Sequence, residues 1–308
     1  MHKVELLAPA RDLEELKANI SNGANAIYIG GEVFGMPTEK DDFSKEDMIK
    51  GIEFAHKTGS KVYVVVNIIP HNEDFIEVES YLKELEAIGV DAIVISDPGM
   101  LTIVKNTIPN MEIHLSDQAN TTNYVTAKFW FEQGIKRVVV SRELSCEEIA
   151  QIRAKTPLEM DIEAFVHGVM TLSYSGRCLI SNYMNGQNCD EKINKRSYSL
   201  VEEKRPGEYF PVYEDEKGTF LFNSQDLCMI EYIPQLIKAG ITSFKIEGKM
   251  KDSKYIEKVV KAYRVAIDEF YKNPNEWKFN KIWLEELEQI SNREFTSGFY
   301  LNNPNDEK

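Results

Sequence analysis

The sequence has few cysteines and no long hydrophobic run. Its four cysteines, Cys146, Cys178, Cys189 and Cys228, are scattered over 308 residues, a spacing that argues against a disulfide framework. No apolar stretch approaches the ~20 residues of a membrane helix. The N-terminus lacks the apolar core and small-residue site of an export signal. We therefore expect a protein of the reducing cytoplasm that makes no membrane contact.

Basic charge is also scarce. The chain has 36 lysines and arginines against 50 aspartates and glutamates, which gives a net charge of −14. A protein that binds nucleic acid by neutralising phosphates usually presents a basic surface. Any contact with RNA must therefore come from a local basic patch or from a partner subunit that supplies the charge.

Several common catalytic signatures are missing. The sequence has no HExxH metalloprotease motif, no GxSxG nucleophile elbow, no P-loop and no GxGxxG turn after its first predicted strand. The segment "YSGRC" contains a serine and a cysteine, but no neighbouring residue marks either as an activated nucleophile. These absences weigh against a peptidase and against a dinucleotide-binding fold.

A repeated unit is present instead: a helical stretch, a glycine, and then a short run rich in Val and Ile. Glycine at that position is typical of a helix C-cap, and continuous apolar strands are typical of a parallel sheet covered on both faces. The predicted strands lie near residues 4–9, 26–30, 61–66, 92–95, 111–116, 137–140, 160–166 and 243–247.

Eight such units in about 250 residues predict a TIM-like (β/α)8 barrel, with a doubly wound sheet as the alternative. The barrel is expected to span 1–274, including a long excursion at 168–222 after strand seven. We expect this excursion to form a hairpin-like cap over the C-terminal mouth. Residues 275–308 are expected to form a helix and an aromatic tail that pack on the barrel.

Polar residues follow most of the predicted strands, where a barrel places its site. We predict catalytic roles for His167, Glu247 and Arg142, and substrate-binding roles for Asn67, His71, Ser116, Gln118, Asn120 and Lys245. Ser116, Gln118, Arg142, His167 and Glu247 are expected to converge on one pocket.

Each of these roles has a structural alternative. Asn67 and His71 could cap the next helix, as Asp97 is expected to do ahead of Pro98. Arg142 could pair with Glu143, or it could clamp a carboxylate or a phosphate.

The segments "LLAPA", "NIIPHN", "HLSDQANTTN", "SREL", "FVHGVM…YSGRCLISNYMNG", "NSQDLC" and "SFKIEGKMK" together resemble the collagenase-like peptidase family U32, and within it the short-chain relatives of tRNA hydroxylation proteins. The resemblance runs over almost the whole chain. It implies a TIM-like barrel and an oxygen-independent hydroxylation of a tRNA wobble uridine with prephenate as the donor. It also implies an iron–sulfur cluster held by four cysteines in the excursion after strand seven.

The sequence departs from the family pattern at two loops. Thr171 stands where the first family cysteine falls, Cys178 matches the second, and "NGQNCDEKINKR" offers only a displaced Cys189 in place of the later pair. Pro37 replaces a family arginine after "FG". A four-thiolate cluster needs four thiolates within reach. We therefore expect no resident cluster, although Cys178 and Cys189 could hold zinc if His167 or a carboxylate completed the site.

Three functions remain open on this evidence. The chain is a subunit of a tRNA-hydroxylating system in which a cluster-bearing U32 paralogue supplies the chemistry and the tRNA contact, or it is a peptidase, or it is a non-catalytic barrel that binds a small carboxylate such as prephenate.

Overall fold

The computed structural model describes residues 3–30, 43–175, 196–201, 207, 209–215, 218–248 and 251–301 of the chain. Within these ranges, side chains are not described for residues 171–175, 196–197, 210–211, 213–215 and 218–224.

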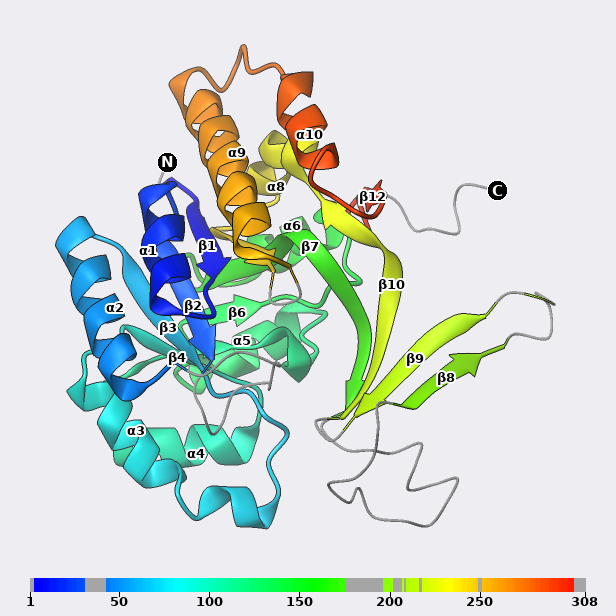
Figure 1. Ribbon diagram of the computed structural model, residues 1–308. Coiled ribbons are helices and arrows are strands. Elements are labelled where there is room, and N and C mark those ends of the chain that lie inside the picture. The colour runs from blue at the N-terminus through cyan, green and yellow to red at the C-terminus, as the bar shows by residue number, and fades with distance from the viewer. Residues whose placement is uncertain are drawn as a thin grey trace.

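Parallel strands form a closed barrel at the centre of the molecule (Figure 1). They are β1 (Glu5–Pro9), β2 (Ala26–Gly30), β3 (Lys61–Val65), β4 (Ala92–Ile95), β5 (Glu112–Leu115), β6 (Arg137–Val139), β7 (Asp161–Ser175) and β11 (Ser243–Glu247). Neighbours in this series pair in parallel, and β11 pairs with both β7 and β1. That double pairing closes the sheet, so the eight-stranded TIM-like barrel is confirmed and the open doubly wound sheet is wrong.

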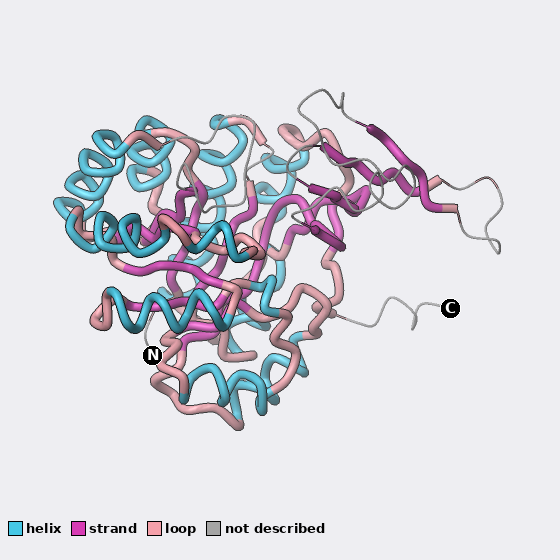
Figure 2. The backbone as a smooth tube through the Cα atoms, turned by 90° about the horizontal axis from the view of Figure 1, so that it is seen from below, coloured by secondary structure: helices cyan, strands magenta, loops and turns pink. Residues whose placement is uncertain are grey.

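Helices surround the barrel (Figure 2). They are α1 (Leu13–Ser21), α2 (Lys45–Thr58), α3 (Val78–Ala87), α4 (Pro98–Thr107), α5 (Tyr124–Glu132), α6 (Cys146–Ala154), α8 (Ile233–Lys238), α9 (Ser253–Lys272) and α10 (Lys281–Glu288), with the 3-10 turns η1 (Asn72–Phe75), η2 (Asp117–Ala119) and η3 (Ile230–Tyr232).

The caps follow the sequence closely. Asp97 is the N-cap of α4: its carboxylate accepts from the Met100 backbone N–H at 3.0 Å, and Pro98 is the first helical residue. Gly59 ends α2 in the left-handed conformation that favours glycine. The cap interpretation of Asp97 is therefore confirmed.

The barrel interior has an apolar half and a charged half. Strands β1 to β4 contribute the buried cluster of Leu7, Ala26, Tyr28, Tyr63, Val65, Ala92 and Val94. Strands β6, β7 and β11 instead place the buried charged residues Arg137, Glu163 and Lys245 inside. The larger apolar core lies between the outer faces of the strands and the helices. The interior chemistry is therefore concentrated on one side of the barrel.

The excursion after the seventh barrel strand begins as an extension of that strand. β7 continues to Ser175 and pairs in antiparallel fashion with β10 (Gly218–Cys228). β10 in turn pairs with β9 (Phe210–Asp215), and β9 pairs with β8 (Arg196–Leu200).

These strands form an arm that runs beyond the C-terminal end of the barrel, and β8 and β9 point away from it (Figure 1). The described part of the excursion is thus hairpin-like, but it stands beside the mouth where a cap over the mouth was expected. The reason is that the ladder between β7 and β10 carries the chain onward in the direction of β7.

The C-terminal segment packs on the barrel wall beside the arm. Its short strand β12 (Phe295–Thr296) pairs with β10. Trp283 of α10 and Tyr300 of the tail are buried. The Tyr300 hydroxyl donates to the backbone carbonyl of Phe165 in β7 at 2.6 Å. The tail therefore contributes directly to the position of a barrel strand.

Candidate functional site

A buried ionic network fills the charged half of the barrel. The Arg137 guanidinium contacts Glu5 at 2.5 Å and Glu163 at 3.1 Å. The second oxygen of Glu163 accepts from Lys245 at 3.0 Å. Burial alone would raise the pKa of Glu163, but the charges of Lys245 and Arg137 outweigh it and lower that pKa. The network therefore keeps its carboxylates ionised beneath the mouth, and Lys245 belongs to it as the partner of Glu163.

A second network lies at the C-terminal mouth and is centred on Arg142. The Arg142 Nε donates to Asp117 Oδ2 at 3.1 Å, and its Nη2 lies 3.6 Å from Glu247 Oε2. Ser116 donates from its hydroxyl to Asp117 Oδ1 at 3.2 Å. Three of the five residues expected to converge therefore lie in one network, because Asp117 joins Ser116 to Arg142 and Glu247 contacts Arg142 directly.

The Arg142 guanidinium is also held from below. Its centre lies 3.8 Å from the centroid of the Phe165 ring, and Nη1 donates to the backbone carbonyl of Val169 at 3.2 Å. Burial would lower the pKa of Arg142, but Asp117 and Glu247 outweigh it and raise that pKa. Burial would also raise the pKa of Asp117, and the charges of Arg142 and Lys245 lower it instead. Both groups are therefore charged, and Glu143, which is exposed, is not their partner.

Asn67 and Ser116 meet inside the barrel mouth. The Asn67 Nδ2 donates to Ser116 Oγ at 3.2 Å. The two residues follow β3 and β5, which are separated in the sheet by β4, so their side chains can touch only on the inner side of the barrel. Both are buried. Asn67 is therefore part of the mouth, and it does not serve as the cap of the next helix.

The other predicted substrate residues lie at or beyond the rim. Gln118 is in η2, and its backbone N–H donates to Ser116 Oγ at 3.4 Å. Asn120 has a φ of 54° and accepts from the Ser141 hydroxyl at 3.2 Å. His71 is exposed and is the N-cap of η1, where its backbone N–H donates to Asp74 at 2.6 Å. The capping alternative thus describes the position of His71.

His167 does not join the mouth, contrary to the sequence-based expectation. It is fully buried, its Nε2 lies 2.8 Å from the Tyr255 hydroxyl, and its ring packs against Tyr263; both tyrosines are in α9. The cause is a β-bulge: the register between β7 and β11 shifts after Phe165, so that His167 faces α9. Burial and the charge of Lys251 lower the pKa of His167 to about 3, so the ring is neutral at physiological pH.

The sequence-based prediction assigned no role to four residues of the site, Asp117, Phe165, Glu163 and Tyr28. The Tyr28 hydroxyl donates to the Ile246 carbonyl at 3.0 Å and lies 3.5 Å from Glu247. A signal existed for Glu163 and Phe165, because they share one face of the strand "MDIEAFV" and a charge inside an apolar strand is unusual. No comparable local signal marks Tyr28.

Two of the four cysteines, Cys146 and Cys228, are described, and both are free thiols. Cys178 and Cys189 lie outside the described residues. Cys228 is buried, and burial raises the pKa of its thiol to about 12; burial also raises the pKa of Cys146. Within the part of the chain that the structure describes, no group of three or more His, Cys, Asp or Glu side chains is placed to hold a metal ion. Since the excursion itself offers only two thiols, we derive no chemical step through a cluster.

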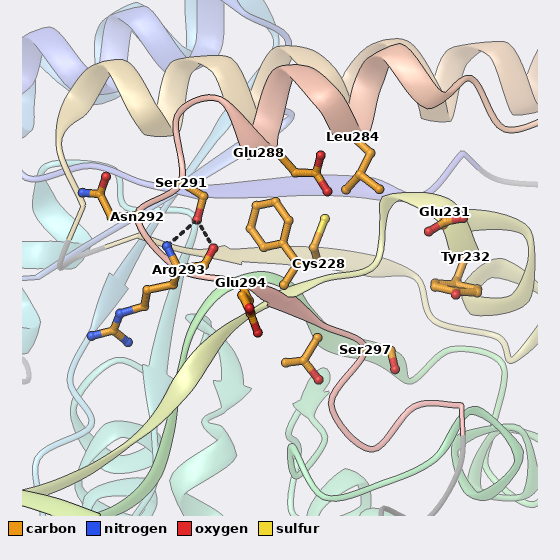
Figure 3. A pocket seen from close by; sticks show the side chains of 12 residues that line it. Cys228, Glu231, Tyr232, Leu284, Glu288, Ser291, Asn292, Arg293, Glu294 and Ser297 are labelled. Atoms are coloured by element: carbon orange, nitrogen blue, oxygen red, sulfur yellow. Dashed lines mark hydrogen bonds between the residues drawn. The ribbon is translucent and has the colours of Figure 1, made fainter. Parts of the chain in front are cut away.

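A separate surface cleft of about 730 Å³ lies against α10. Figure 3 shows Leu284 and Glu288 of α10 facing Cys228, with Ser291 hydrogen-bonded to the Arg293 backbone at 2.8 and 3.2 Å. None of the predicted site residues lines this cleft. The mouth is therefore the better candidate site.

A TIM-like barrel with a polar mouth that carries paired charges is a fold that supports many enzymes. The family model for peptidase family U32 matches residues 11–308, and the chain belongs to this family. Within the described residues, no helix is long and apolar enough to cross a membrane.

Relatives with assigned names are found at moderate identity. The chain is 39% identical to tRNA hydroxylation protein P1 of Bacillus subtilis, over 98% of this chain and 72% of that protein. It is 37% identical to tRNA hydroxylation protein P2 of the same organism, over 98% of both chains. A solved structure, the U32 peptidase Mk0906, shares the fold with a TM-score of 0.53 and 14% identity, over 80% of this chain and 95% of that one.

Proposed function

We propose that this chain acts in the hydroxylation of tRNA at the wobble uridine, within the cytoplasm. The observation that carries the proposal is the likeness, over nearly the whole chain, to two proteins named for tRNA hydroxylation. The mouth adds support, since it offers an amide, a hydroxyl, carboxylates and a guanidinium as fixed hydrogen-bonding groups. Polar groups of this kind can orient a nucleobase and a small acid.

Peptidase activity is the weaker alternative. A serine or cysteine peptidase needs a nucleophile within reach of a basic histidine. Among the described residues, His167 has a pKa of about 3 and faces α9, and the Cys228 thiol has a pKa of about 12. The buried His114 is paired with Glu112 at 2.9 Å. Neither histidine is available as a base at the mouth.

A small carboxylate such as prephenate is the proposed co-substrate, and Arg142 is its proposed anchor. Asp117 holds Arg142 Nε at 3.1 Å, whereas Glu247 lies farther from Nη2, at 3.6 Å. An incoming carboxylate can therefore take the Nη2 side of the guanidinium while Asp117 keeps the side chain in place. On this proposal Glu247, released from Arg142, remains beside the Tyr28 hydroxyl.

A cluster-bearing U32 paralogue is the proposed partner. The chain has a net charge of −14 and only two cysteines in its excursion, so a partner would have to supply both the cluster and most of the phosphate contacts. Affinity purification of the tagged chain from its own host, followed by mass spectrometry, tests this. We expect a paralogue with the complete cysteine set to co-purify, and recovery of the chain alone at low salt would contradict the partnership.

Nucleoside analysis of tRNA tests the function itself. In a strain from which the gene is deleted, we expect 5-hydroxyuridine and its derivatives to fall, and a plasmid copy of the wild type to restore them. An Arg142→Gln copy should fail to restore them. The Glu143→Gln copy is the matched control, because Glu143 is adjacent in the chain but exposed. Unchanged nucleosides in the deletion strain would refute the proposal.

A further inference from the structure

Asn67 carries a buried hydrogen-bond acceptor that no described group satisfies. The residue is 7% exposed, and its Oδ1 has no hydrogen-bond partner among the described residues. Its backbone is fixed, because the Ser96 hydroxyl donates to the Asn67 carbonyl at 3.1 Å. Buried polar atoms in folded proteins nearly always have partners. An acceptor left unpaired at the inner rim of a barrel mouth therefore points to a ligand that supplies the donor.

The orientation of the Asn67 amide follows from its neighbours. Asp117 is ionised because Arg142 and Lys245 lower its pKa against the effect of burial, so its carboxylate can only accept. The Ser116 hydroxyl must then donate its hydrogen to Asp117 Oδ1, and it can only accept from Asn67. The amide nitrogen of Asn67 therefore faces Ser116, and the oxygen is the atom left without a donor.

The chemistry of this corner favours a neutral donor over an anion. Asn67 donates to Ser116, Ser116 donates to the Asp117 carboxylate, and that carboxylate in turn accepts from Arg142. A carboxylate ligand is drawn to the guanidinium and repelled from this corner. The Asn67 amide can form two hydrogen bonds with a neutral ring that carries an N–H between two carbonyl groups. Asn67 Oδ1 accepts from the ring N–H, and the amide hydrogen that is not given to Ser116 is donated to one of the ring carbonyls.

We propose that Asn67 holds a uracil base, with its Oδ1 accepting a hydrogen bond from the imide N3–H. The inference rests on the proposed function and adds the residue that selects the base. In the same pose cytosine would set its N3 lone pair against Oδ1, so the contact selects uracil. Because the edge is accessible only in an unpaired base, the substrate must present an unpaired uridine, as an anticodon loop does.

The test combines a change in the ligand with a change in the protein. The full chain, purified with any subunit that accompanies it, is titrated with a fluorescent anticodon stem-loop RNA that carries uridine, N3-methyluridine or cytidine at the wobble position. Asn67→Ala is compared with Asn106→Ala, a matched control because Asn106 is an exposed asparagine on α4. Circular dichroism establishes that each variant is folded.

We expect the wild type and Asn106→Ala to bind the uridine RNA about tenfold more tightly than the other two RNAs, as the loss of one buried hydrogen bond predicts. Asn67→Ala should bind all three RNAs with the same weaker affinity. Wild-type protein that binds the three RNAs equally, or none of them, overturns the inference without need of a variant. Asn67→Ala that still discriminates also overturns it. If tRNA nucleosides nevertheless change in the deletion strain, the proposed function stands and only the role of Asn67 fails.

Discussion

Arg142 is the residue on which the mouth depends. Its guanidinium contacts two mouth carboxylates, Asp117 and Glu247, and its centre lies 3.8 Å from the centroid of the Phe165 ring. A lysine cannot reproduce that arrangement, because a single ammonium lacks the planar fork that contacts both carboxylates and a ring at once.

Replacing Arg142 by methionine should lower the free energy of unfolding by about 3 kcal/mol at pH 7, because Asp117 is left buried without its counter-charge. The Asp117 pKa is lowered in the folded protein. Its contribution to stability is therefore present above the unfolded carboxyl pKa and is lost as the pH falls through the folded value.

Urea titrations at pH 7 and at about pH 3, which is below the unfolded carboxyl pKa of about 3.9, check this prediction. The difference between wild type and variant should shrink at the lower pH. Glu143→Gln is the control and should change neither curve. Equal losses at both pH values would contradict the role given to Asp117.

His167 gives a second residue-scale prediction. Burial lowers its folded pKa to about 3, whereas the unfolded chain has a histidine pKa near 6.5. Between these values the unfolded state binds the extra proton, so the protein loses stability as the pH falls from about 6.5 towards 3. By pH 5 the loss should be about 2 kcal/mol.

His167→Gln, which retains a partner for the Tyr255 hydroxyl, should remove that part of the pH dependence. The measurement is the free energy of unfolding at pH 7.5 and pH 5 for the variant, the wild type and His71→Gln, an exposed-histidine control. Burial also lowers the pKa of His114. Because His114 is present in the wild type and in both variants, its contribution to the pH dependence is the same in all three proteins. A wild-type pH dependence in His167→Gln would show that the ring is not the group that titrates.

At the scale of the element, the bulge in β7 decides which side chains enter the site. At the bulge, the backbone carbonyl of Val166 accepts from the Tyr263 hydroxyl at 2.7 Å and from the Met229 N–H at 2.9 Å. The Phe165 carbonyl accepts from Tyr300. α9, the end of β10 and the C-terminal tail thus hold the bulge from outside. The bulge leaves Phe165 under Arg142 and turns His167 away.

Gly168 makes the bulge possible, and Gly168→Ala tests it. Its φ is +108°, and an added Cβ would overlap the Glu247 backbone carbonyl. Gly134 has a φ of +90°, but no heavy atom lies within 4 Å of the Cβ position. Gly134→Ala should therefore cost about 1 kcal/mol for its conformation alone. Gly168→Ala should cost at least about 3 kcal/mol, or prevent folding.

The comparison is read from urea unfolding curves of the two variants, or from their soluble yields if Gly168→Ala does not fold. If the two substitutions cost the same, the close approach of β7 to Glu247 is not a constraint on the fold.

At the scale of the whole molecule, the division of the barrel interior matters most. The half formed by β1 to β4 is filled mainly by apolar side chains, and the half formed by β6, β7 and β11 carries Arg137, Glu163 and Lys245. Glu5 of β1 joins the two halves by pairing with Arg137. Residues from both halves meet at the mouth, where Tyr28 of β2 lies beside Glu247 and Asn67, which follows β3, donates to Ser116. The net negative charge of the whole chain also matters, because it repels a polyanion such as RNA.

The charge of −14 predicts that the chain alone binds tRNA poorly. At physiological salt its affinity should be no better than about 10 μM, within the range of non-specific binding. Addition of the proposed cluster-bearing paralogue should tighten binding by at least about tenfold, with the steeper salt dependence that phosphate contacts produce. Gel-shift titrations with and without the paralogue measure both. Tight, salt-sensitive binding by the isolated chain would contradict the division of labour.

The sequence alone determined the barrel, because its apolar strands and helix caps are local signals, and both occur in each of the repeated helix–glycine–strand units. It also predicted that Asn67, Ser116, Arg142 and Glu247 lie at the mouth, because in a barrel the residues that follow successive strands must meet there. Only the tertiary structure decided their partners. Asp117 and Phe165 reach Arg142 from other strands, and side-chain contacts between strands leave no local pattern. The predicted position of His167 was wrong for the same reason. Strict alternation along "EAFVH" would point its side chain into the barrel, but a bulge held by α9, β10 and the tail turns it outward.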